Sequence, residues 1–360
     1  MSRLCVVAAG GTGGHMFPAE ALAREMSGRG WRVVLATDAR GEAYAQGFPA
    51  EERLALDAAT GRGPLGLIKA GLAIGRGVMQ ARDAFARLDA DVVVGFGGYP
   101  SAPALVAAIV DRRPSLIHEQ NAVLGRTNRT LAPFVTRVAS AFPTLEKAPN
   151  QVKANATVTG NPVRADIAAL ADRIYAAPVE GPIRVLVTGG SQGARLLSEA
   201  VPQALAALPE AIRARLEVSQ QSRPETMQAA SQTYLEAGVR AEVAPFFRDM
   251  AQRLGGAHLL IGRAGASTCS ELAVTATPSL LIPLKIAMDD HQTLNARALS
   301  DAGAAEVLAE DEATLSALNQ RLGALLGDPQ RLKAMSDAAR TAAHLDATHR
   351  LADLAESIAR

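Results

Sequence analysis

A glycine-rich segment near the start of the chain, AGGTGGHMFP at residues 9–18, could bind a phosphate group. It directly follows the apolar run Leu4–Ala8, and backbone N–H groups in such a turn can approach an anion closely. A P-loop would end in Gly-Lys-Ser/Thr, whereas Gly14 is followed by His15. The dinucleotide fingerprint G-x-G-x-x-G is also broken, because Met16 occupies the third glycine position. The segment therefore predicts a phosphate-binding turn of another kind.

Asp38 follows the next strand-like run, Trp31–Thr37, where the dinucleotide-binding class carries a ribose-binding acid. Because the third fingerprint glycine is missing, the pattern disfavours NAD, and we expect no cofactor. A structural interpretation stays open, in which the glycines only tighten a turn from strand to helix. Four glycines and a histidine, however, are more than such a turn requires.

A second candidate anion site lies in GRAGASTCSEL at residues 262–272. Its small residues follow a strand-like run and precede a helix that we expect to begin at Ser267 or Thr268. A helix N-terminus offers unpaired N–H groups and a positive dipole end, so it can bind an anion without a metal. Glu271 has two interpretations. It completes a capping box with Thr268, or it accepts both hydroxyls of a ribose whose diphosphate lies at the helix start.

Two histidines, His15 and His118, stand at the ends of strand-like runs. A lone histidine usually packs or forms hydrogen bonds, but His15 closes a glycine loop and histidine has a pKa near working pH, so His15 is a candidate general base. Asp89-Ala90-Asp91 imitates a D-x-D metal motif but precedes its strand, at the edge opposite to the glycine loops. The sequence has no H-E-x-x-H and no cysteine–histidine cluster, so we expect no protein-bound metal.

Composition narrows the class of protein. A chain of 360 residues allows two domains. Its 37 Lys and Arg nearly balance 36 Asp and Glu, and aromatics make up only 4%, which argues against nucleic-acid binding. Cys5 and Cys269 look like reduced packing residues of a cytosolic protein. We expect no signal peptide, and no apolar run reaches the ~18 residues of a membrane span.

Apolar runs alternate with helical patterns throughout, which predicts an α/β fold with parallel sheets covered on both faces. The opening order of strand, glycine loop and helix restarts near residue 181. We therefore expect two doubly wound, Rossmann-like domains at 1–162 and 163–340, with a helix at 341–360 that packs back on the first. Ligands bind outside the carboxyl ends of such strands. The glycine segments at 10–14, 95–98, 189–193 and 262–265 all follow strands, so we expect them to line one cleft.

The segment 62–87 mixes aliphatic residues with five basic residues and one acid, Asp83, giving a net charge of +4. It is either an ordinary helix face or a contact with anionic lipid. At about 1 kcal/mol per charge, lipid contact would contribute about 4 kcal/mol, which suffices for reversible adhesion.

Together these segments resemble the MurG family of bacterial N-acetylglucosaminyltransferases. The similarity runs from Gly10 to about Ala305, with the motifs in the same order and spacing. They are GGTGGH (10–15), GGYPS (97–101), HEQN (118–121), GNPVR (160–164), GGSQGAR (189–195), TCSE (268–271) and DHQ (290–292) followed by Asn295 and Ala296.

The resemblance implies a GT-B fold, with two Rossmann-like domains and the donor in a cleft between them. It implies transfer of N-acetylglucosamine from UDP-GlcNAc to the muramoyl 4-hydroxyl of undecaprenyl-linked lipid I, which forms lipid II for peptidoglycan. The protein would be peripheral on the cytoplasmic face of the inner membrane. It would contact anionic lipid through 62–87 and meet the cell-wall and division machinery.

The resemblance also implies roles for individual residues. Gly13 and Gly14 would face the donor sugar and the acceptor diphosphate, together with Thr12. Asn121, Arg164 and Ser191 would contact the donor. The residues implied at the helix start are Ala266, Ser267, Thr268, Cys269 and Ser270. Phe247 would lie at the uracil, Glu271 at the ribose and Gln292 at the GlcNAc hydroxyls. In the implied inverting displacement, His15 is the candidate base and Glu119 the fallback.

Two alternatives stay open. A UDP-GlcNAc 2-epimerase uses a similar fold and the same nucleotide sugar, but needs no lipid acceptor. A two-lobed solute-binding protein also has two α/β lobes, although a histidine-ended glycine loop and the expected lack of an export signal disfavour it.

Overall fold

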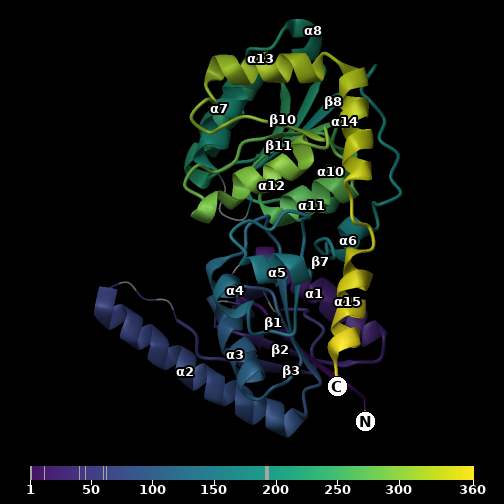
Figure 1. Cartoon of the computed structure of the whole chain (residues 1–360). Coiled ribbons are helices and arrows are strands. Elements are labelled where there is room, and N and C mark those ends of the chain that lie inside the picture. Colours follow the sequence, from purple (N-terminus) through teal and green to yellow (C-terminus); the bar gives the residue numbers. More distant parts are fainter. Residues whose placement is uncertain are drawn as a thin grey trace. The chain divides into compact units, whose positions relative to one another are not determined.

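The structure is a computed structural model that describes residues 2–11, 13–39, 41–44, 46–59, 61, 63–190 and 194–360, with the side chains of 43, 44, 64 and 67 excepted (Figure 1). The chain divides into two units. Unit 1 comprises Met1–Arg164 with Asp346–Arg360, and unit 2 comprises Ala165–Leu345. The unit boundaries thus lie slightly beyond the expected residues 162 and 340. Within the described residues, no helix has the length and apolar character needed to span a membrane.

Unit 1 is built on a seven-stranded parallel sheet in the order β3-β2-β1-β4-β5-β6-β7. Its strands are β1 (Leu4–Ala8), β2 (Arg32–Thr37), β3 (Glu52–Ala55), β4 (Val92–Gly95), β5 (Ser115–Glu119), β6 (Arg137–Ser140) and β7 (Ala156–Val158). Its helices are α1 (Gly13–Gly28), α2 (Gly63–Leu88), α3 (Ala102–Val110), α4 (Arg126–Leu131), α5 (Asn150–Asn155) and α15 (Ala347–Ile358), with short 3-10 turns at Gly41–Tyr44 and Tyr99–Ser101.

The continuous apolar sequence of β1 follows from burial on both faces of the sheet. Leu4, Val6 and Ala8 belong to one hydrophobic cluster with residues of α2 and α3, whereas Cys5 and Val7 belong to another with residues of α1 and α15. Alternate side chains of a strand point to opposite faces, so each face receives its own helical layer. The parallel α/β class expected from the sequence is confirmed.

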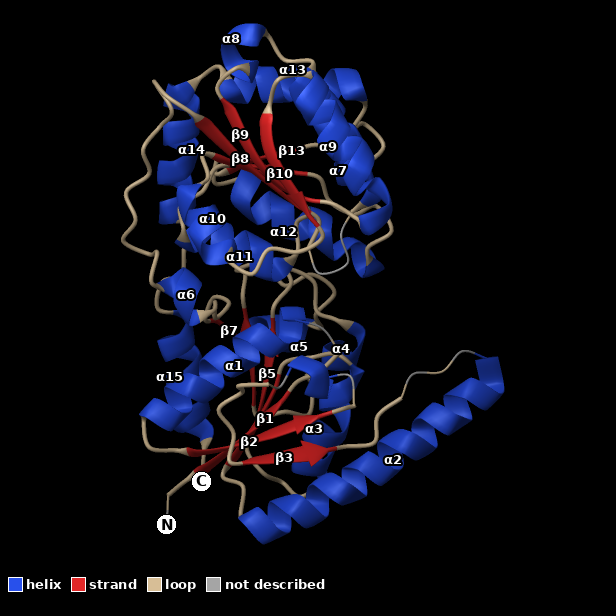
Figure 2. Ribbon diagram, turned by 180° about the vertical axis from the view of Figure 1, so that it is seen from behind, coloured by secondary structure: helices blue, strands red, loops and turns tan. Residues whose placement is uncertain are grey.

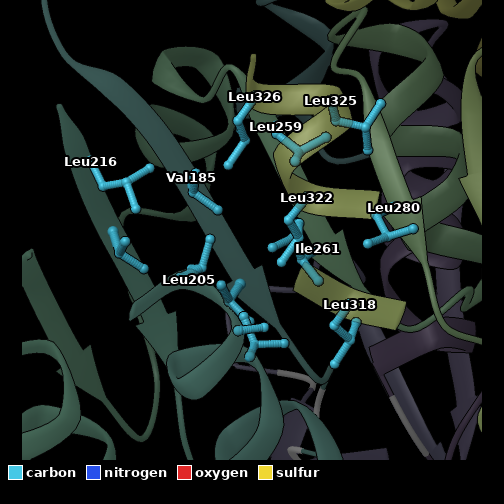
Figure 3. Packing of buried hydrophobic residues seen from close by; sticks show 14 of the residues in the cluster. Val185, Leu205, Leu216, Leu259, Ile261, Leu280, Leu318, Leu322, Leu325 and Leu326 are labelled. Carbon is cyan, nitrogen blue, oxygen red and sulfur yellow. The ribbon is translucent and has the colours of Figure 1, made fainter. Parts of the chain in front are cut away.

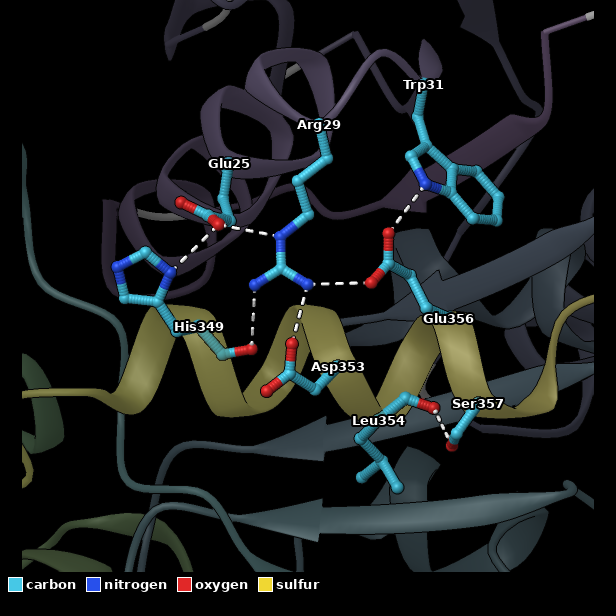
Figure 4. Close-up of polar contacts among 8 residues, drawn as sticks. All are labelled: Glu25, Arg29, Trp31, His349, Asp353, Leu354, Glu356 and Ser357. Carbon is cyan, nitrogen blue, oxygen red and sulfur yellow. Dashed lines mark hydrogen bonds and ion pairs between the residues drawn. The ribbon is translucent and has the colours of Figure 1, made fainter.

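The C-terminal helix α15 packs against α1. Leu351, Ala352 and Ala355 are fully buried in the cluster that α1 contributes to. At the rim, Arg29 Nη1 donates to both Asp353 and Glu356, 2.6 and 2.7 Å away, and Trp31 Nε1 donates to Glu356 (Figure 4). The buried apolar face supplies most of the stabilisation, because partly exposed ion pairs contribute little.

Unit 2 repeats the architecture with a six-stranded parallel sheet in the order β10-β9-β8-β11-β12-β13 (Figure 2). Its strands are β8 (Ile183–Thr188), β9 (Leu216–Gln221), β10 (Arg240–Ala244), β11 (Leu259–Gly262), β12 (Ser279–Leu281) and β13 (Ala305–Val307). Its helices are α6 (Ala165–Ala168), α7 (Arg195–Ala206), α8 (Glu210–Arg213), α9 (Met227–Glu236), α10 (Met250–Gly256), α11 (Ala266–Val274), α12 (His291–Ser300), α13 (Leu315–Leu326) and α14 (Pro329–Thr341). Val185 and Ile261 meet Leu318 and Leu322 in its core (Figure 3).

Both sheets reverse their strand order at one point, between β1 and β4 in unit 1 and between β8 and β11 in unit 2. In open parallel sheets, ligands bind at the carboxyl ends of the strands that flank such a switch point. The described residues of the glycine segments after β1, β4, β8 and β11 lie there. The topology therefore places the candidate residues of each unit at a single edge of its sheet.

Candidate functional site

In unit 1, the switch point is formed by the turn from β1 into α1. The helix begins at Gly13, so the backbone N–H groups of Gly13, Gly14 and His15 belong to its first turn, where no intrahelical partner is available. These groups and the helix dipole favour an anion at this position. Thr12 lies outside the described residues.

The turn is packed too tightly for any residue other than glycine at position 10. A Cβ added at Gly10 would lie 2.8 Å from both Asp38 Oδ1 and Pro100 Cβ. Asp38 is buried and accepts hydrogen bonds from Gly41 N at 2.9 Å and from Tyr99 Oη at 3.1 Å. Asp38 thus supports the glycine turn, and its likeness to a ribose-binding acid is misleading.

His15 and Arg164 both lie near the first turn of α1. A Cβ added at Gly98 would lie 3.6 Å from Cε1 of His15, so the imidazole sits against the turn that follows β4. The guanidinium carbon of Arg164 lies 5.2 Å from the centre of the Phe17 ring, which itself covers Gly13. The structure therefore brings GGTGGH, the Gly97–Gly98 turn and the end of GNPVR together.

His118, at the carboxyl end of β5, is fully buried and serves as a structural link. Its Nε2 lies 3.0 Å from the carbonyl of Gly160, and its Nδ1 lies 3.1 Å from Nε2 of Gln120. A carbonyl accepts and an amide donates, so we assign the proton to Nε2 of a neutral ring. Burial lowers the pKa of His118 to about 4, and the bond to Gly160 partly offsets this. His118 therefore fastens GNPVR to the sheet.

Glu119 is also buried, with 2% of its surface exposed. Oε1 accepts from the backbone N and the Nδ2 of Asn121, each at 3.1 Å. Oε2 accepts from Gly125 N at 2.9 Å and from Asn128 Nδ2 at 2.8 Å. The carboxylate of the fallback base is thus engaged by four donors that organise the loop after β5.

In unit 2, α11 begins at Ala266, with Gly265 as its N-cap and no side-chain cap. Thr268 therefore lies inside the first turn, and Thr268 and Glu271 do not form the capping box that the sequence allows. The expected helix start at Ser267 or Thr268 is one or two residues late. Ser267 Oγ is buried and has no hydrogen-bond partner among the described residues, so this hydroxyl is available to a ligand or a water.

The other small residues of α11 have structural contacts. Ser270 Oγ donates to the carbonyl of Ala266 at 3.0 Å. Cys269 is buried, and burial raises the pKa of its thiol to about 12, so it packs as an apolar side chain. The groups of this segment that can face an anion are therefore the N–H groups of the first turn and the hydroxyls of Ser267 and Thr268.

Gln292 and its neighbours follow β12, the next strand of the sheet. Gln292 Oε1 accepts from Leu284 N at 3.0 Å, which leaves Nε2 as the group able to donate to a sugar hydroxyl. His291 Nδ1 contacts the carbonyl of Met288 at 2.7 Å and thereby closes its own loop. The fully buried Asn295 donates to the carbonyl of Ala264 at 3.1 Å, which fixes α12 against the loop that precedes α11.

Phe247 is buried, and the guanidinium carbon of Arg253 lies 3.9 Å from the centre of its ring. Arg253 also contacts Asp249, Ser219 and Glu242. The side chain of Phe247 is thus engaged within unit 2, consistent with a role for its backbone in ligand contact. Ser191 lies outside the described residues.

Asp89 and Asp91 lie at the amino end of β4, away from the glycine turns. Asp91 Oδ2 accepts from Leu4 N at 2.7 Å, and Asp89 pairs with Arg113 at 3.6 Å. In the part of the chain that the structure describes, no group of three or more His, Cys, Asp or Glu could hold a metal ion.

Sequence reasoning missed several buried polar residues that shape these sites. Asn128 holds Glu119, and Arg263 donates to the carbonyls of Ile282 and Pro283 and pairs with Glu310. Both polar side-chain atoms of the buried Asn161, inside GNPVR, lack a hydrogen-bond partner among the residues that the structure describes. Asn161 and Arg263 belong to segments that the sequence singled out, GNPVR and GRAGASTCSEL, but residue type and spacing gave no sign of these contacts. Asn128 lies outside those segments.

Two parallel-sheet units, each with a helix start at its switch point, are the architecture of GT-B glycosyltransferases, and comparison with known proteins confirms this class. The chain belongs to glycosyltransferase family 28. The N-terminal domain of that family matches residues 5–140, and its C-terminal domain matches residues 184–356.

A Caulobacter vibrioides protein named UDP-N-acetylglucosamine–N-acetylmuramyl-(pentapeptide) pyrophosphoryl-undecaprenol N-acetylglucosamine transferase is 62% identical over the full length of both chains. The crystal structure of Acinetobacter baumannii MurG is similar with a TM-score of 0.81, at 32% identity, over 99% of each chain. A Listeria monocytogenes structure described as a putative UDP-N-acetylglucosamine 2-epimerase has a TM-score of 0.68 at 16% identity, over 98% of this chain and 95% of that one, which shows a shared fold alone.

Burial of neutral His118 predicts that unit 1 loses stability in acid. Its pKa of about 4 in the folded protein lies below the value of about 6.5 in the unfolded chain, so protonation favours unfolding. This contribution is complete above pH 6.5 and is lost as the pH falls toward 4, by roughly 3 kcal/mol in total. Urea unfolding followed by the fluorescence of Trp31, the single tryptophan, reports on unit 1.

His118→Gln should flatten that pH dependence. His258→Gln is the matched control, because burial also lowers the pKa of His258 to about 4 but the residue belongs to unit 2. An identical acid dependence of the Trp31 transition in wild type and His118→Gln would contradict the assignment.

Proposed function

We propose that this chain transfers N-acetylglucosamine from UDP-GlcNAc to the muramoyl 4-hydroxyl of lipid I, with inversion, forming lipid II for peptidoglycan. The observation that carries the proposal is the 62% identity over full length to an enzyme named for this reaction. Fold alone would not carry it, because the same architecture hosts other chemistry. For that reason the 2-epimerase alternative, which rests on fold similarity at 16% identity, is not favoured.

The donor half of the reaction is assigned to unit 2. We assign the diphosphate of UDP-GlcNAc to the start of α11, where the N–H groups of Ala266, Ser267 and Thr268 have no partner within the helix and the hydroxyl of Ser267 is available as a further donor. As UDP leaves, its growing negative charge is stabilised by these fixed donors. Glu271 accepts the ribose hydroxyls, Gln292 donates to the GlcNAc hydroxyls, and the backbone of Phe247 contacts the uracil. Ser191 also serves the diphosphate.

The acceptor half is assigned to unit 1. Gly13 and Gly14, in the first turn of α1, are assigned to the acceptor diphosphate and the donor sugar, and Thr12 is assigned the same role. Arg164, next to that turn, supplies a positive charge for a diphosphate, and Asn121 contacts the donor. His15 removes the proton of the muramoyl 4-hydroxyl while that oxygen attacks the anomeric carbon, and the bond to UDP breaks in the same step.

Membrane contact is assigned to the first half of α2, which stands clear of the other elements of unit 1 (Figure 2). Leu65, Ile68 and Leu72 are 77, 60 and 61% exposed, at helical spacing that puts them on one face. The ion pairs of α2 change the charge argument. Arg76, Arg82 and Arg87 pair with Asp57, Asp111 and Glu52, so less than the net +4 of the segment faces lipid.

The apolar face is therefore the larger contribution to membrane contact, with basic residues as support. UDP-GlcNAc is a soluble nucleotide sugar and the acceptor is lipid-linked, so such a face would hold the enzyme on the cytoplasmic side of the inner membrane. Enzymes of cell-wall synthesis and division are the partners expected at that surface.

Transfer of radiolabelled GlcNAc from UDP-GlcNAc to a lipid I analogue tests the function. Wild type should form product, with and without EDTA. His15→Ala should lower kcat at least about a hundredfold while KM for UDP-GlcNAc changes little, because a positioned base contributes typically 10²–10⁴-fold.

His349→Ala, a largely exposed histidine of unit 1 on α15, is the matched control and should behave as wild type. Absence of product from wild type, or conversion of UDP-GlcNAc to its manno epimer without acceptor, refutes the function. An effect of His15→Ala on KM alone would make His15 a binding residue.

Glu271→Gln should weaken UDP-GlcNAc binding about tenfold without lowering the melting temperature. The reason is that hydrogen bonds from two hydroxyls to a charged carboxylate contribute roughly 1.5–3 kcal/mol to the binding free energy. The neutral amide of glutamine retains part of this contribution. Isothermal titration with UDP-GlcNAc measures the change, and Glu236→Gln on α9 serves as control. A lower melting temperature with unchanged affinity would instead give Glu271 a structural role.

Ile68→Glu should abolish flotation of the protein with vesicles that contain phosphatidylglycerol, because it places a charge on the apolar face. Turnover with a short-chain, water-soluble acceptor should stay at the wild-type level. Ile174→Glu makes the same change at an isoleucine of unit 2 that is 89% exposed and should leave flotation intact. Undiminished flotation of Ile68→Glu would place membrane contact elsewhere.

A further inference from the structure

The carboxylate of Glu119 is the centre of a buried hydrogen-bond network at the end of β5. Its four donors come from three positions of the following loop, Asn121, Gly125 and Asn128, at 2.8 to 3.1 Å. An ionised carboxylate has about four lone-pair sites, so these donors account for its full accepting capacity. A proton from a substrate would have to displace one of them.

The network continues from Asn128 to the turn that holds His15. Asn128 is 2% exposed, and a Cβ added at Gly97 would lie 2.9 Å from its Nδ2. Gly97 and Gly98 have φ values of 83° and 69°, which glycine adopts without strain. Gly98 in turn lies against the imidazole of His15. The side chain of Asn128 thereby connects the buried carboxylate of Glu119 to the Gly97–Gly98 turn, against which His15 packs.

We propose that Glu119 is a positioning residue for the transfer reaction. Through Asn128 it holds the Gly97–Gly98 turn in the shape that supports His15, and through two bonds it fixes Asn121. This inference rests on the proposed function and replaces the role of fallback base. The sheet itself does not depend on the carboxylate, because β5 pairs with β6 through backbone bonds, including that from Ala141 N to Glu119 O.

A double-variant cycle tests the proposal. Glu119→Gln turns two accepting sites into donors that face Gly125 N and Asn128 Nδ2, so kcat should fall at least about tenfold with KM for UDP-GlcNAc little changed. Asn128→Asp alone opposes two carboxylates and should be at least as damaging. In the double variant, the amide of residue 119 can donate to the carboxylate of residue 128, so kcat should recover at least about threefold over either single variant.

The pH profile separates positioning from base catalysis. If His15 is the base, kcat falls at low pH as His15 becomes protonated. Glu119→Gln should keep this acid limb of the pH profile, with kcat lower than in wild type at every pH. Loss of that limb together with no recovery in the double variant would overturn the proposal. Glu146→Gln, on the neighbouring segment that contacts this loop through its backbone, is the matched control.

Asn128→Ala provides a second route if Glu119→Gln does not fold. It leaves the carboxylate in place but removes the link to Gly97, so kcat should again fall at least about tenfold with the acid limb kept. An unchanged kcat would overturn the proposal.

Amide hydrogen exchange of the segment 119–128, measured by mass spectrometry, gives a readout independent of turnover. Exchange should be faster in Glu119→Gln than in wild type, and equal rates would count against the proposal. A wild type that transfers nothing refutes the proposed function, whereas the exchange result still decides whether Glu119 holds the loop.

Discussion

Burial of each parallel sheet on both faces is the constraint on which the rest of the structure depends. Strand β1 is apolar throughout, and β8 is apolar from Val185 to Val187, because both faces of these strands are covered. Ligand-binding groups can therefore emerge only where the strands end. Since all strands of a unit are parallel, their carboxyl ends lie at one edge, and the reversal of strand order opens that edge between two neighbouring strands. Backbone N–H groups at the helix starts are available there without any special side chain.

The same constraint explains why so many polar side chains near these edges are buried. The backbone N–H and C=O groups of a loop at a strand end have no neighbouring strand to bond. Buried side chains therefore form hydrogen bonds with them. Asp38 and Glu119 each accept from several donors, and Asn295 fixes a carbonyl of the loop before α11. Removing one partner of such a group leaves a buried polar atom unsatisfied, which costs more than the bond itself contributes. Asp38 and Glu119 therefore hold the loops of their site through several bonds each.

The sequence predicted the features that depend on local pattern. Apolar runs, the glycines after them and the restart near residue 181 were enough for two parallel-sheet units, because strand burial and turn chemistry are local properties. The individual roles of polar residues were not predictable in the same way. Glu119 looked like a fallback base, and the structural role of His118 was not specified. Their partners Asn128 and Gly160 come from other segments of the chain. Thr268 and Glu271 fit a capping box by spacing, yet the helix begins earlier, at Ala266. Residue type and spacing do not distinguish a buried residue that holds a loop from one that binds a ligand. The difference lies in the hydrogen-bond donors that surround the side chain in the folded protein.

The distribution of charge in unit 2 bears on how a leaving diphosphate would be stabilised. Arg263 follows β11 directly, where a cation could face the ligand, but its guanidinium donates to the carbonyls of Ile282 and Pro283 and pairs with Glu310. Lys285, on the next loop, pairs with Asp311. Both cations are thus matched by acceptors of the protein itself. The first turn of α11 is different, because its N–H groups cannot be satisfied within the helix and, within the part of the chain that the structure describes, the hydroxyl of Ser267 has no hydrogen-bond partner. Donors of this kind are oriented before the reaction and need no rearrangement as charge develops, which is the condition under which electrostatic stabilisation of a transition state is most effective.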